Sequence, residues 1–421
     1  MLSFNSTPSL DHTDLPGDIL ECILDNFVND RRTLASCTLV CRSLLHPSRS
    51  RLFRSVFRKS RGGENAGTIL FELQVHPFPE LVRTLELSAF GQHLCTRHVL
   101  PAILMHLPNL DELKLWGLET RCSCDGASRE PEQLPRGLFQ LRKLELHHLA
   151  HRTPDAFLDF LGLFSEIDTL SINCDAILIH LPIRGAAGVQ DPSVFTDGTG
   201  LDQLCIRSAN IRGSTAATTS CLLFHILLVT PSAQSLRTLH ATFDCAADLL
   251  ACTALLPHCP NLRHVDFGQW LTFDQKDYHL WDRLSLRECG SLEECTVATT
   301  LCAFSILFTE AIESKLQQNM AIINVLSRLP PSVRHVTIIF NETDPDMGTL
   351  RDCYDWKQLC DMLEPLCSQL RTLTLKISDI YDSESRFAQL KEFVEGKTAS
   401  LRGKACVRIM EQAERQWWYA M

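Results

Sequence analysis

A short apolar motif recurs along most of this chain and limits the folds that the chain can adopt. The motif is L-x-x-L-x-L with conservative apolar substitutions, and its ten starts run from position 82 to position 370, a mean spacing of 32 residues. The fourth and sixth positions alternate as in a strand with one buried face. The starts are Val82, Leu110, Leu141, Ile167, Leu201, Leu236, Leu262, Leu292, Val333 and Leu370.

Amphipathic stretches with helical spacing precede several of these motifs. Strands that alternate with helices are expected to run parallel, because each connection crosses back over the core. One unit cannot bury its apolar face alone, so stacked units stabilise one another. We predict an α/β fold, an irregular solenoid of short parallel strands and helices over residues 81–389; an α/β domain without solenoid order is the alternative. The predicted helices are Val99 to Leu107, Ala156 to Phe164, Ala247 to Leu256, Met320 to Leu329 and Trp356 to Leu366.

Residues 13–61 form a different unit, with helical periodicity throughout. Apolar residues over positions 15–28 fall on one face of a helix, and Pro16 is tolerated in the first turn of such a helix. A second helix is predicted over positions 34–45, and a third short piece over positions 51–58. Three short helices in so few residues make a marginal core, so part of their apolar surface is predicted to face a partner or the rest of the chain.

Several segments of this unit occur in a characteristic order. They are Leu15-Pro16, Ile19-Leu20, Ile23-Leu24, Val40-Cys41-Arg42 and Leu52-Phe53-Arg54. In this order they resemble an F-box, and the repeat array resembles the leucine-rich-repeat domains that follow F-boxes in many fungal proteins. The mean spacing of 32 residues exceeds the usual 20–29 of leucine-rich repeats. One position departs from the family pattern: Leu44 stands where members often carry an aromatic residue, which keeps apolar bulk but removes an aromatic anchor.

The resemblance implies a non-catalytic substrate-recognition adaptor of an SCF-type ubiquitin ligase. Its F-box would bind the Skp adaptor, and through it the cullin, while the repeats bind an unidentified protein target. The alternative is a repeat scaffold for protein–protein interaction with no ligase attached, in which the N-terminal helices only cap the solenoid. The residues implied to bind the adaptor are Leu15, Pro16, Ile19, Leu20, Ile23, Leu24, Val40, Cys41, Leu44, Leu52 and Phe53.

Composition and charge are consistent with a folded protein that binds other proteins. Hydrophobic residues make up 45% of the 421 residues and charged residues 21%, as in globular chains. A net charge of −10 disfavours a general nucleic-acid binder. The first fifteen residues show no signal-peptide pattern, and the longest apolar run, positions 221–229, is far shorter than the ~20 residues of a membrane span. We therefore expect a cytoplasmic or nuclear location, with the nineteen cysteines as free thiols.

Patterns that would indicate catalysis or a bound metal are weak. Gly396-Lys397-Thr398 matches the end of a phosphate-binding loop, but Lys391 occupies the position of its first glycine. Cysteines spaced by seven fit one buried helical face better than a reactive site. No catalytic residue, metal or cofactor is predicted. The one group with metal-ligand residue types is Cys122, Cys124, His147, His148 and His151, and its C-x-C spacing is too short for a typical zinc site.

The remaining segments are predicted as connections and ends. Residues 1–12 are expected to be disordered, and residues 62–80 to form a linker and a first helix. Three polar insertions are expected to be loops, at Glu119 to Arg136, Pro182 to Gly200 and Asn341 to Thr349. Residues 390–421, with Trp417, Trp418 and Tyr419, are expected to form a capping helix.

Overall fold

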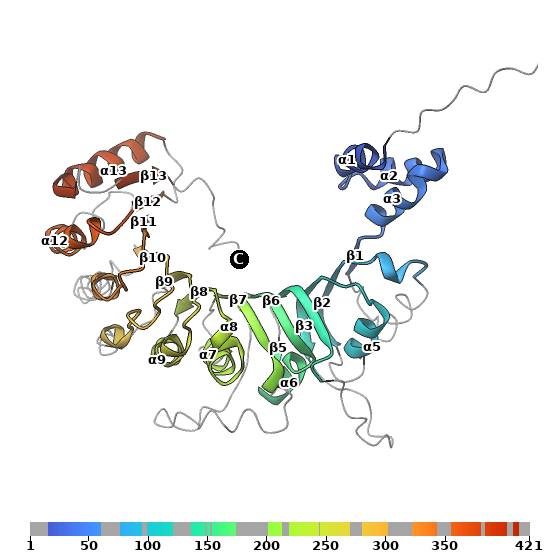
Figure 1. The fold of residues 1–421 in the computed structure, drawn as a ribbon, viewed down its shortest axis with the longest axis horizontal. Helices are drawn as coiled ribbons and strands as arrows, with labels where there is room; N and C mark the ends of the chain where they lie inside the picture. Colours follow the sequence, from blue (N-terminus) through green and yellow to red (C-terminus); the bar gives the residue numbers. More distant parts are fainter. Residues whose placement is uncertain are drawn as a thin grey trace, which may run out of the picture.

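The chain forms an arc with strands along its inner side and helices along its outer side (Figure 1). The computed structural model describes residues 16–59, 76–94, 99–120, 136–147, 150–151, 154–173, 201–212, 219–243, 245–269, 280–301, 322–342, 355–379, 384–401 and 407–411. The expected disordered N-terminus, most of the expected linker and most of the three expected loops lie outside these ranges.

The described strands belong to one sheet, and every described pairing in it is parallel. The order along the arc is β1-β2-β3-β4-β6-β7-β8-β9-β10-β11-β12-β13, with β5 pairing beside β3. The bounds are β1 Ser55–Lys59, β2 Thr84–Leu94, β3 Glu112–Thr120, β4 Phe139–His147, β5 Ala150–His151, β6 Phe164–Asn173, β7 Cys205–Arg212, β8 Thr238–Phe243, β9 His264–Gln269, β10 Glu294–Leu301, β11 His335–Glu342, β12 Thr372–Asp379 and β13 Val407–Glu411. The predicted parallel, solenoid-like α/β architecture is confirmed.

Helices cover the outer side of the arc, and an additional helical unit lies at its N-terminal end (Figure 1). The helices of the arc are α5 Val99–His106, α6 Pro154–Leu161, α7 Thr219–Val229, α8 Ser232–Ser235, α9 Ala246–Leu255, α12 Trp356–Cys367 and α13 Glu384–Lys397, together with residues 322–327. Short 3₁₀ turns are η1 Pro79–Leu81, η3 Leu201–Gln203, η4 Leu256–His258 and η7 Ala399–Leu401. The five helices predicted from amphipathic stretches all occur within about one turn of their predicted bounds.

The repeat motif keeps one register across the sheet. Leu85 pairs with Leu113, and the ladder continues through the fourth motif position of every later unit. This register stacks the apolar side chains of successive strands into one continuous core between the sheet and the helices. The buried residues at this position are Leu85, Leu113, Leu144, Leu170, Ala209, Leu239, Val265, Cys295, Val336 and Leu373.

The turns before the strands link each repeat to the one before it. Asn109 donates a side-chain hydrogen bond to the Glu80 carbonyl at 2.8 Å, and Asn261 donates to the Gln234 carbonyl at 2.7 Å. These amides satisfy backbone carbonyls at the edge where the sheet begins. The turns at Pro108-Asn109 and Pro260-Asn261 therefore join neighbouring units as well as reversing the chain.

The unit predicted to start at Leu201 has a different register in the structure. Ile206, not Leu201, pairs with Ile167, so Ala209 occupies the fourth motif position. The leucines of the predicted motif instead close the turn η3, where the Leu204 N–H donates to the Leu201 carbonyl at 3.0 Å. Both leucines are buried there, so their apolar spacing gives the same signal as a strand.

The N-terminal unit also differs from the prediction. A second helix was expected over 34–45, but the chain forms α2, Arg31–Val40, and α3, Arg42–Leu52, with extended backbone at Cys41 between them. The first helix is α1, Gly17–Asp25. The expected third piece, 51–58, includes the end of α3 and most of β1, which pairs with β2. The sheet thus begins inside the segment that was assigned to the N-terminal unit.

The C-terminal segment is not one capping helix. The helix α13 ends at Lys397, and Val407–Glu411 form β13 beside β12, with Leu373 opposite Val407. A further repeat therefore follows the ten that were predicted, with its apolar positions at Val407 and Ile409. The three aromatic residues at 417–419 lie outside the described residues.

Candidate interaction surfaces

The N-terminal helical unit, residues 16–53, is shaped by local capping. Asp30 caps α2, because its carboxylate accepts hydrogen bonds from the backbone N–H groups of Arg32 and Thr33 at 3.1 and 3.0 Å. The Thr33 hydroxyl also donates to this carboxylate at 2.7 Å, and that bond, followed by the backbone bonds, lowers the pKa of the Asp30 carboxyl. The Pro16 carbonyl accepts from Ile19 N–H at 3.0 Å and so begins α1. The three helices are therefore short and separately bounded.

One arginine connects the helices of this unit. Arg51 in α3 forms an ion pair with Asp25 at 2.7 Å and also donates to the Glu21 carbonyl of α1 at 3.0 Å. A third bond runs from Arg51 to the Pro47 carbonyl of its own helix at 3.2 Å. The Arg51 side chain is 12% exposed, whereas its partner Asp25 is 64% exposed, so the ion pair lies at the surface of the unit. These bonds fix α1 against α3 where little apolar surface is available to do so.

The helical unit leaves much of its apolar surface exposed. Within residues 16–53, only Leu24, Leu34 and Ser48 are buried. Ile19 and Ile23 are each 44% exposed on one face of α1, and the end of α2 is more exposed still, with Leu39 at 87% and Val40 at 70%. Large apolar side chains left in water in this way mark a surface that is suited to contact with a protein.

The predicted adaptor-binding residues fall into different environments. Leu24 is buried and not available to a partner in this structure, whereas Phe53 packs on Phe78 with ring centroids 4.9 Å apart and stays partly exposed. Leu15 lies outside the described residues. Sequence reasoning missed Leu39, which lies five residues after Leu34, off the apolar face of α2, and has no counterpart in the motifs that carry the resemblance. The exposed ones are Pro16, Ile19, Ile23, Val40 and Cys41, and the half-buried ones are Leu20, Leu44, Leu52 and Phe53.

A charged and aromatic cluster lies on the solvent-facing side of β3 and β4. The Trp116 ring stacks on the His147 ring, with centroids 3.8 Å apart and planes at 7°. Beside it, Glu145 contacts Lys143 and lies 3.3 Å from the Lys114 amine. The neighbouring His147, then Lys143 and Lys114, hold the pKa of the Glu145 carboxyl well below its ordinary value, against the opposing effect of burial. The cluster is a rigid patch on the inner face of the arc.

A groove of about 580 Å³ opens where β3 and β4 begin. It exists because β4 pairs with β6 from Phe139 onward but with β3 only from Lys143 onward, so its first residues extend beyond the start of β3. Met105 and Leu138 line the groove and are 61% and 63% exposed. A signal for it was present in the sequence, because Phe139 stands where several other units carry Pro, Gly or Ser.

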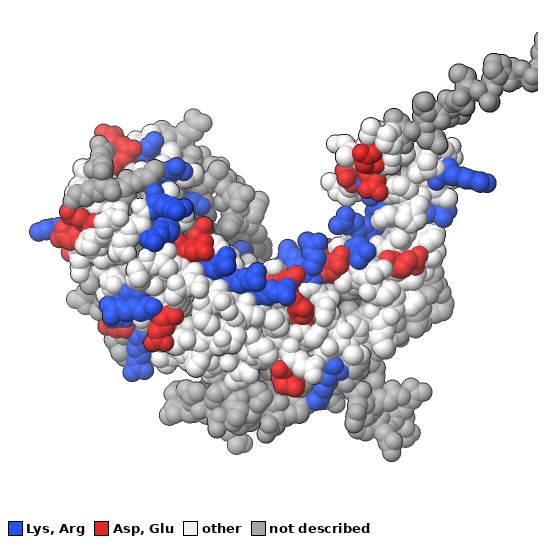
Figure 2. All heavy atoms as spheres, in the orientation of Figure 1, with Lys and Arg blue, Asp and Glu red and all other residues white. Residues whose placement is uncertain are grey.

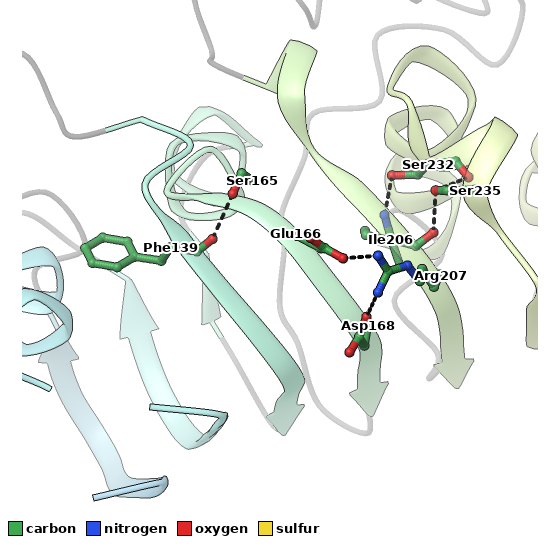
Figure 3. Close-up of polar contacts among 8 residues, drawn as sticks. All are labelled: Phe139, Ser165, Glu166, Asp168, Ile206, Arg207, Ser232 and Ser235. Atoms are coloured by element: carbon green, nitrogen blue, oxygen red, sulfur yellow. Dashed lines mark hydrogen bonds and ion pairs between the residues drawn. The ribbon is translucent and has the colours of Figure 1, made fainter. Parts of the chain in front are cut away.

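The charged side chains at this groove are mostly paired with one another. Arg207 on β7 reaches both Glu166 and Asp168 on β6 (Figure 3). Arg83 lies 3.8 Å from the Asp111 carboxylate. Figure 3 also shows how the next turn is anchored to β7, since Ser232 accepts from the Ile206 N–H at 3.0 Å and Ser235 donates to the Ile206 carbonyl at 3.1 Å.

The structure describes only part of the segments considered for metal or phosphate chemistry. Among the described residues, no group of three or more His, Cys, Asp or Glu side chains is arranged to hold a metal ion. Cys122, Cys124 and His148 of the metal-like group lie outside those residues, and of His151 the structure describes only the backbone. Thr398 is buried, and its hydroxyl donates to the Val394 carbonyl at 2.8 Å.

The cysteines at the turns before the strands are part of the core. Cys259 and Cys289 are both buried, and their thiols contact backbone carbonyls of the preceding segment. Burial raises the pKa of Cys259 to about 12 and that of Cys289 to about 11. A thiol with so high a pKa stays protonated at neutral pH and is a poor nucleophile.

Comparison with known proteins adds no assignment. No model of a known protein family matches the chain, and no curated protein matches it significantly. None of the described helices combines the length and apolar character that crossing a lipid bilayer requires. The function therefore has to be argued from the surfaces described above.

Proposed function

We propose that this chain is a substrate-recognition adaptor of an SCF-type ubiquitin ligase. Its N-terminal helical unit would be an F-box that binds the Skp adaptor, and its repeat domain would bind a protein target. The chain itself would be non-catalytic, because its role is to hold the target near a ubiquitin-conjugating enzyme that the complex supplies. The sequence resemblance motivates this proposal, and the exposed apolar surface of the helical unit supports it.

The observation that carries the proposal is the exposure of Ile19, Ile23, Leu39 and Val40. A short helical unit with so few buried side chains gains stability when a partner covers these residues. Helices that present apolar side chains at spacings of four are suited to a partner groove. Leu44, where F-box proteins often carry an aromatic residue, is half-buried, so we infer that the more exposed end of α2 supplies the main contact.

The alternative function is a repeat scaffold with no ligase attached, in which α1–α3 cap the solenoid. The packing of Phe53 on Phe78 and the pairing of β1 with β2 are the observations that favour it. In that role Leu39 and Val40 would contribute little, because they lie away from any described contact with the repeats.

The test is capture of the full chain by purified Skp adaptor. We expect the wild type to bind and the Leu39→Asp, Val40→Asp variant to lose at least about a hundredfold in affinity, since buried interface anchors contribute at least 2 kcal/mol each. The matched control is Met105→Asp, Leu138→Asp, which changes two apolar residues on the repeats that are also mostly exposed, at 61% and 63%. If the folded wild type is not captured by the Skp adaptor, the ligase role is excluded and the scaffold function remains.

A further inference from the structure

The second position of the repeat motif forms a row along the edge where the strands begin. The backbone fixes this row, because the N–H at this position donates to the carbonyl at the same position of the preceding repeat, for example from Arg263 to Arg237 at 2.8 Å. Side chains from successive strands therefore stand next to each other. From the N-terminus the row reads Arg54, Arg83, Asp111, Arg142, Asp168, Arg207, Arg237, Arg263, Glu293, Arg334 and Arg371.

The two halves of this row differ in charge. In the N-terminal half, acids stand between the arginines and form ion pairs with them, as Arg207 does with Glu166 and Asp168. In the C-terminal half, four arginines flank a single acid, Glu293. Figure 2 shows Lys and Arg side chains gathered along the inner margin of the arc, in a chain whose net charge is −10. We call the four residues Arg237, Arg263, Arg334 and Arg371 the arginine track.

The arginines of the track keep their charge available to a partner. Arg237 and Arg371 are exposed and make no side-chain hydrogen bond or ion pair within the described structure. Arg263 is 58% exposed and lies 3.9 Å from Glu293, a long contact. Arg334 donates hydrogen bonds to the carbonyls of Gln369 and Pro331. Because these carbonyls are uncharged, they do not neutralise its positive charge.

The acids next to the track on the inner face are already engaged. Glu294 lies 3.1 Å from His264, and Asp266 lies 3.2 Å from His240. Both partners are histidines, which carry charge only when protonated, so these contacts tie up the two carboxylates by position and do not cancel their charge. Along the row itself, from Arg237 to Arg371, arginines outnumber acids four to one.

We propose that the arginine track binds an acidic segment of a protein partner. Neighbouring strands lie about 4.8 Å apart, so the track spans about 19 Å from β8 to β12, the length of about six extended residues. Guanidinium groups pair with carboxylates in two-point geometry, which suits Asp and Glu side chains at this spacing. The chain's overall negative charge favours a polypeptide over a nucleic acid as the occupant. This proposal names the kind of protein that the repeat domain would bind. It rests on the proposed function only for what happens to that protein once it is bound.

The test measures binding of a fluorescein-labelled peptide of ten glutamates to the full chain by fluorescence anisotropy. We expect binding that weakens with added salt, because the contacts are exposed ion pairs. The variant Arg237→Glu, Arg371→Glu should bind about tenfold more weakly or worse, since it replaces two attractions with repulsions. The variant Arg237→Gln, Arg371→Gln should show a smaller loss of the same kind.

The matched control reverses charge on the outer helices, at Lys357 of α12 and Lys391 of α13, both exposed. Lys357→Glu, Lys391→Glu changes the net charge by the same amount and should leave peptide binding within about twofold of wild type. Equal losses in the two charge-reversal variants would overturn the proposal, and so would absence of binding at low salt. A single-stranded oligonucleotide of equal charge that bound more tightly than the peptide would also overturn it.

The same variants separate this proposal from the ligase role. Capture by the Skp adaptor should be unchanged in Arg237→Glu, Arg371→Glu, because the track lies on the repeats. If the adaptor does not bind but the peptide does, the ligase role fails and the track stands. If the adaptor binds but the peptide does not, the track fails and the ligase role stands.

Discussion

The helical unit and the repeat domain are stabilised by different kinds of interaction. The repeat domain has one core cluster that runs from Val56 to Leu401, to which each strand of the path from β1 to β13, β5 aside, contributes buried or partly buried side chains. The helical unit has two buried leucines, Leu24 and Leu34, that are not part of this cluster. The repeats are therefore stabilised by stacking, whereas the helices depend on caps, on the bonds of Arg51 and on whatever covers their exposed face.

The joint between the two regions is small. Phe53 meets Phe78 and His76, and the Arg49 guanidinium lies 5.1 Å from the Phe78 ring centroid. Beyond these contacts, β1 continues the sheet. A joint of this size lets the helical unit open without unfolding the repeats, which is the expected behaviour of stability units with few shared contacts.

The largest expected effect is on the core of the repeats. Phe243 is fully buried, and its ring lies 5.5 Å from Phe267 and 5.6 Å from Trp281. Phe243→Ala should lower the free energy of unfolding of the repeats by about 3–5 kcal/mol, through lost burial and the cavity left behind. Urea denaturation followed by tryptophan fluorescence measures it, and a loss below about 1 kcal/mol would contradict the continuous core.

The next effect should stay within the helical unit. Leu34 is fully buried in α2, and Leu34→Ala should lower the stability of α1–α3 by about 2–3 kcal/mol. Because the joint is small, hydrogen exchange of residues 280–401 should not change. Faster exchange in both regions would show that they unfold as one unit and would remove the contrast between them.

A smaller loss is expected when Arg51 is replaced. Arg51→Ala removes the ion pair with Asp25 and the bonds to two backbone carbonyls, and should lower the stability of the helical unit by about 1–2 kcal/mol. Arg42→Ala, an exposed change in the same helix, is the matched control and should cost less than about 0.5 kcal/mol. Exchange rates of the α1 amides distinguish the two variants; similar rates would mean that Arg51 does not hold α1.

The smallest expected effect concerns Glu145 on the inner face of the repeats. Its folded-state pKa lies below the ordinary value of 4.5, so its charge stabilises the fold above pH 4.5, and this contribution is lost as the pH falls further. Glu145→Gln should cost about 1 kcal/mol at pH 7. The difference in the free energy of unfolding between the variant and the wild type should be smaller when denaturation is repeated at pH 3. If this difference does not change with pH, the charge of Glu145 is not its source.

Much of the repeat architecture could be predicted because each unit carries its own signal. A motif with apolar residues at its first, fourth and sixth positions fixes the strand, the register and the buried face together. The exception is the unit with Ala209, where a small residue stands at the fourth position and two leucines in the preceding turn imitate the motif. Apolar spacing does not record whether a leucine is buried in a strand or in a turn.

The less predictable features depend on tertiary pairing. β1 and β13 have weak motifs and become strands because β2 and β12 offer them unpaired edges. The break at Cys41 could not be read from periodicity, because a helical period continues through it. The exposure of Leu39 could have been, since position 39 lies off the apolar face that contains Leu34. The arginine track required the register of the sheet, since residues 26–41 positions apart in sequence become neighbours only across strands.

The most direct test of the proposed role is hydrogen–deuterium exchange of the full chain with and without purified Skp adaptor. We expect slower exchange in residues 16–53, strongest at the end of α2 around Leu39 and Val40, with residues 280–401 unchanged. Unaltered exchange in residues 16–53 at saturating adaptor, or protection confined to the repeats, would contradict an F-box role for the helical unit.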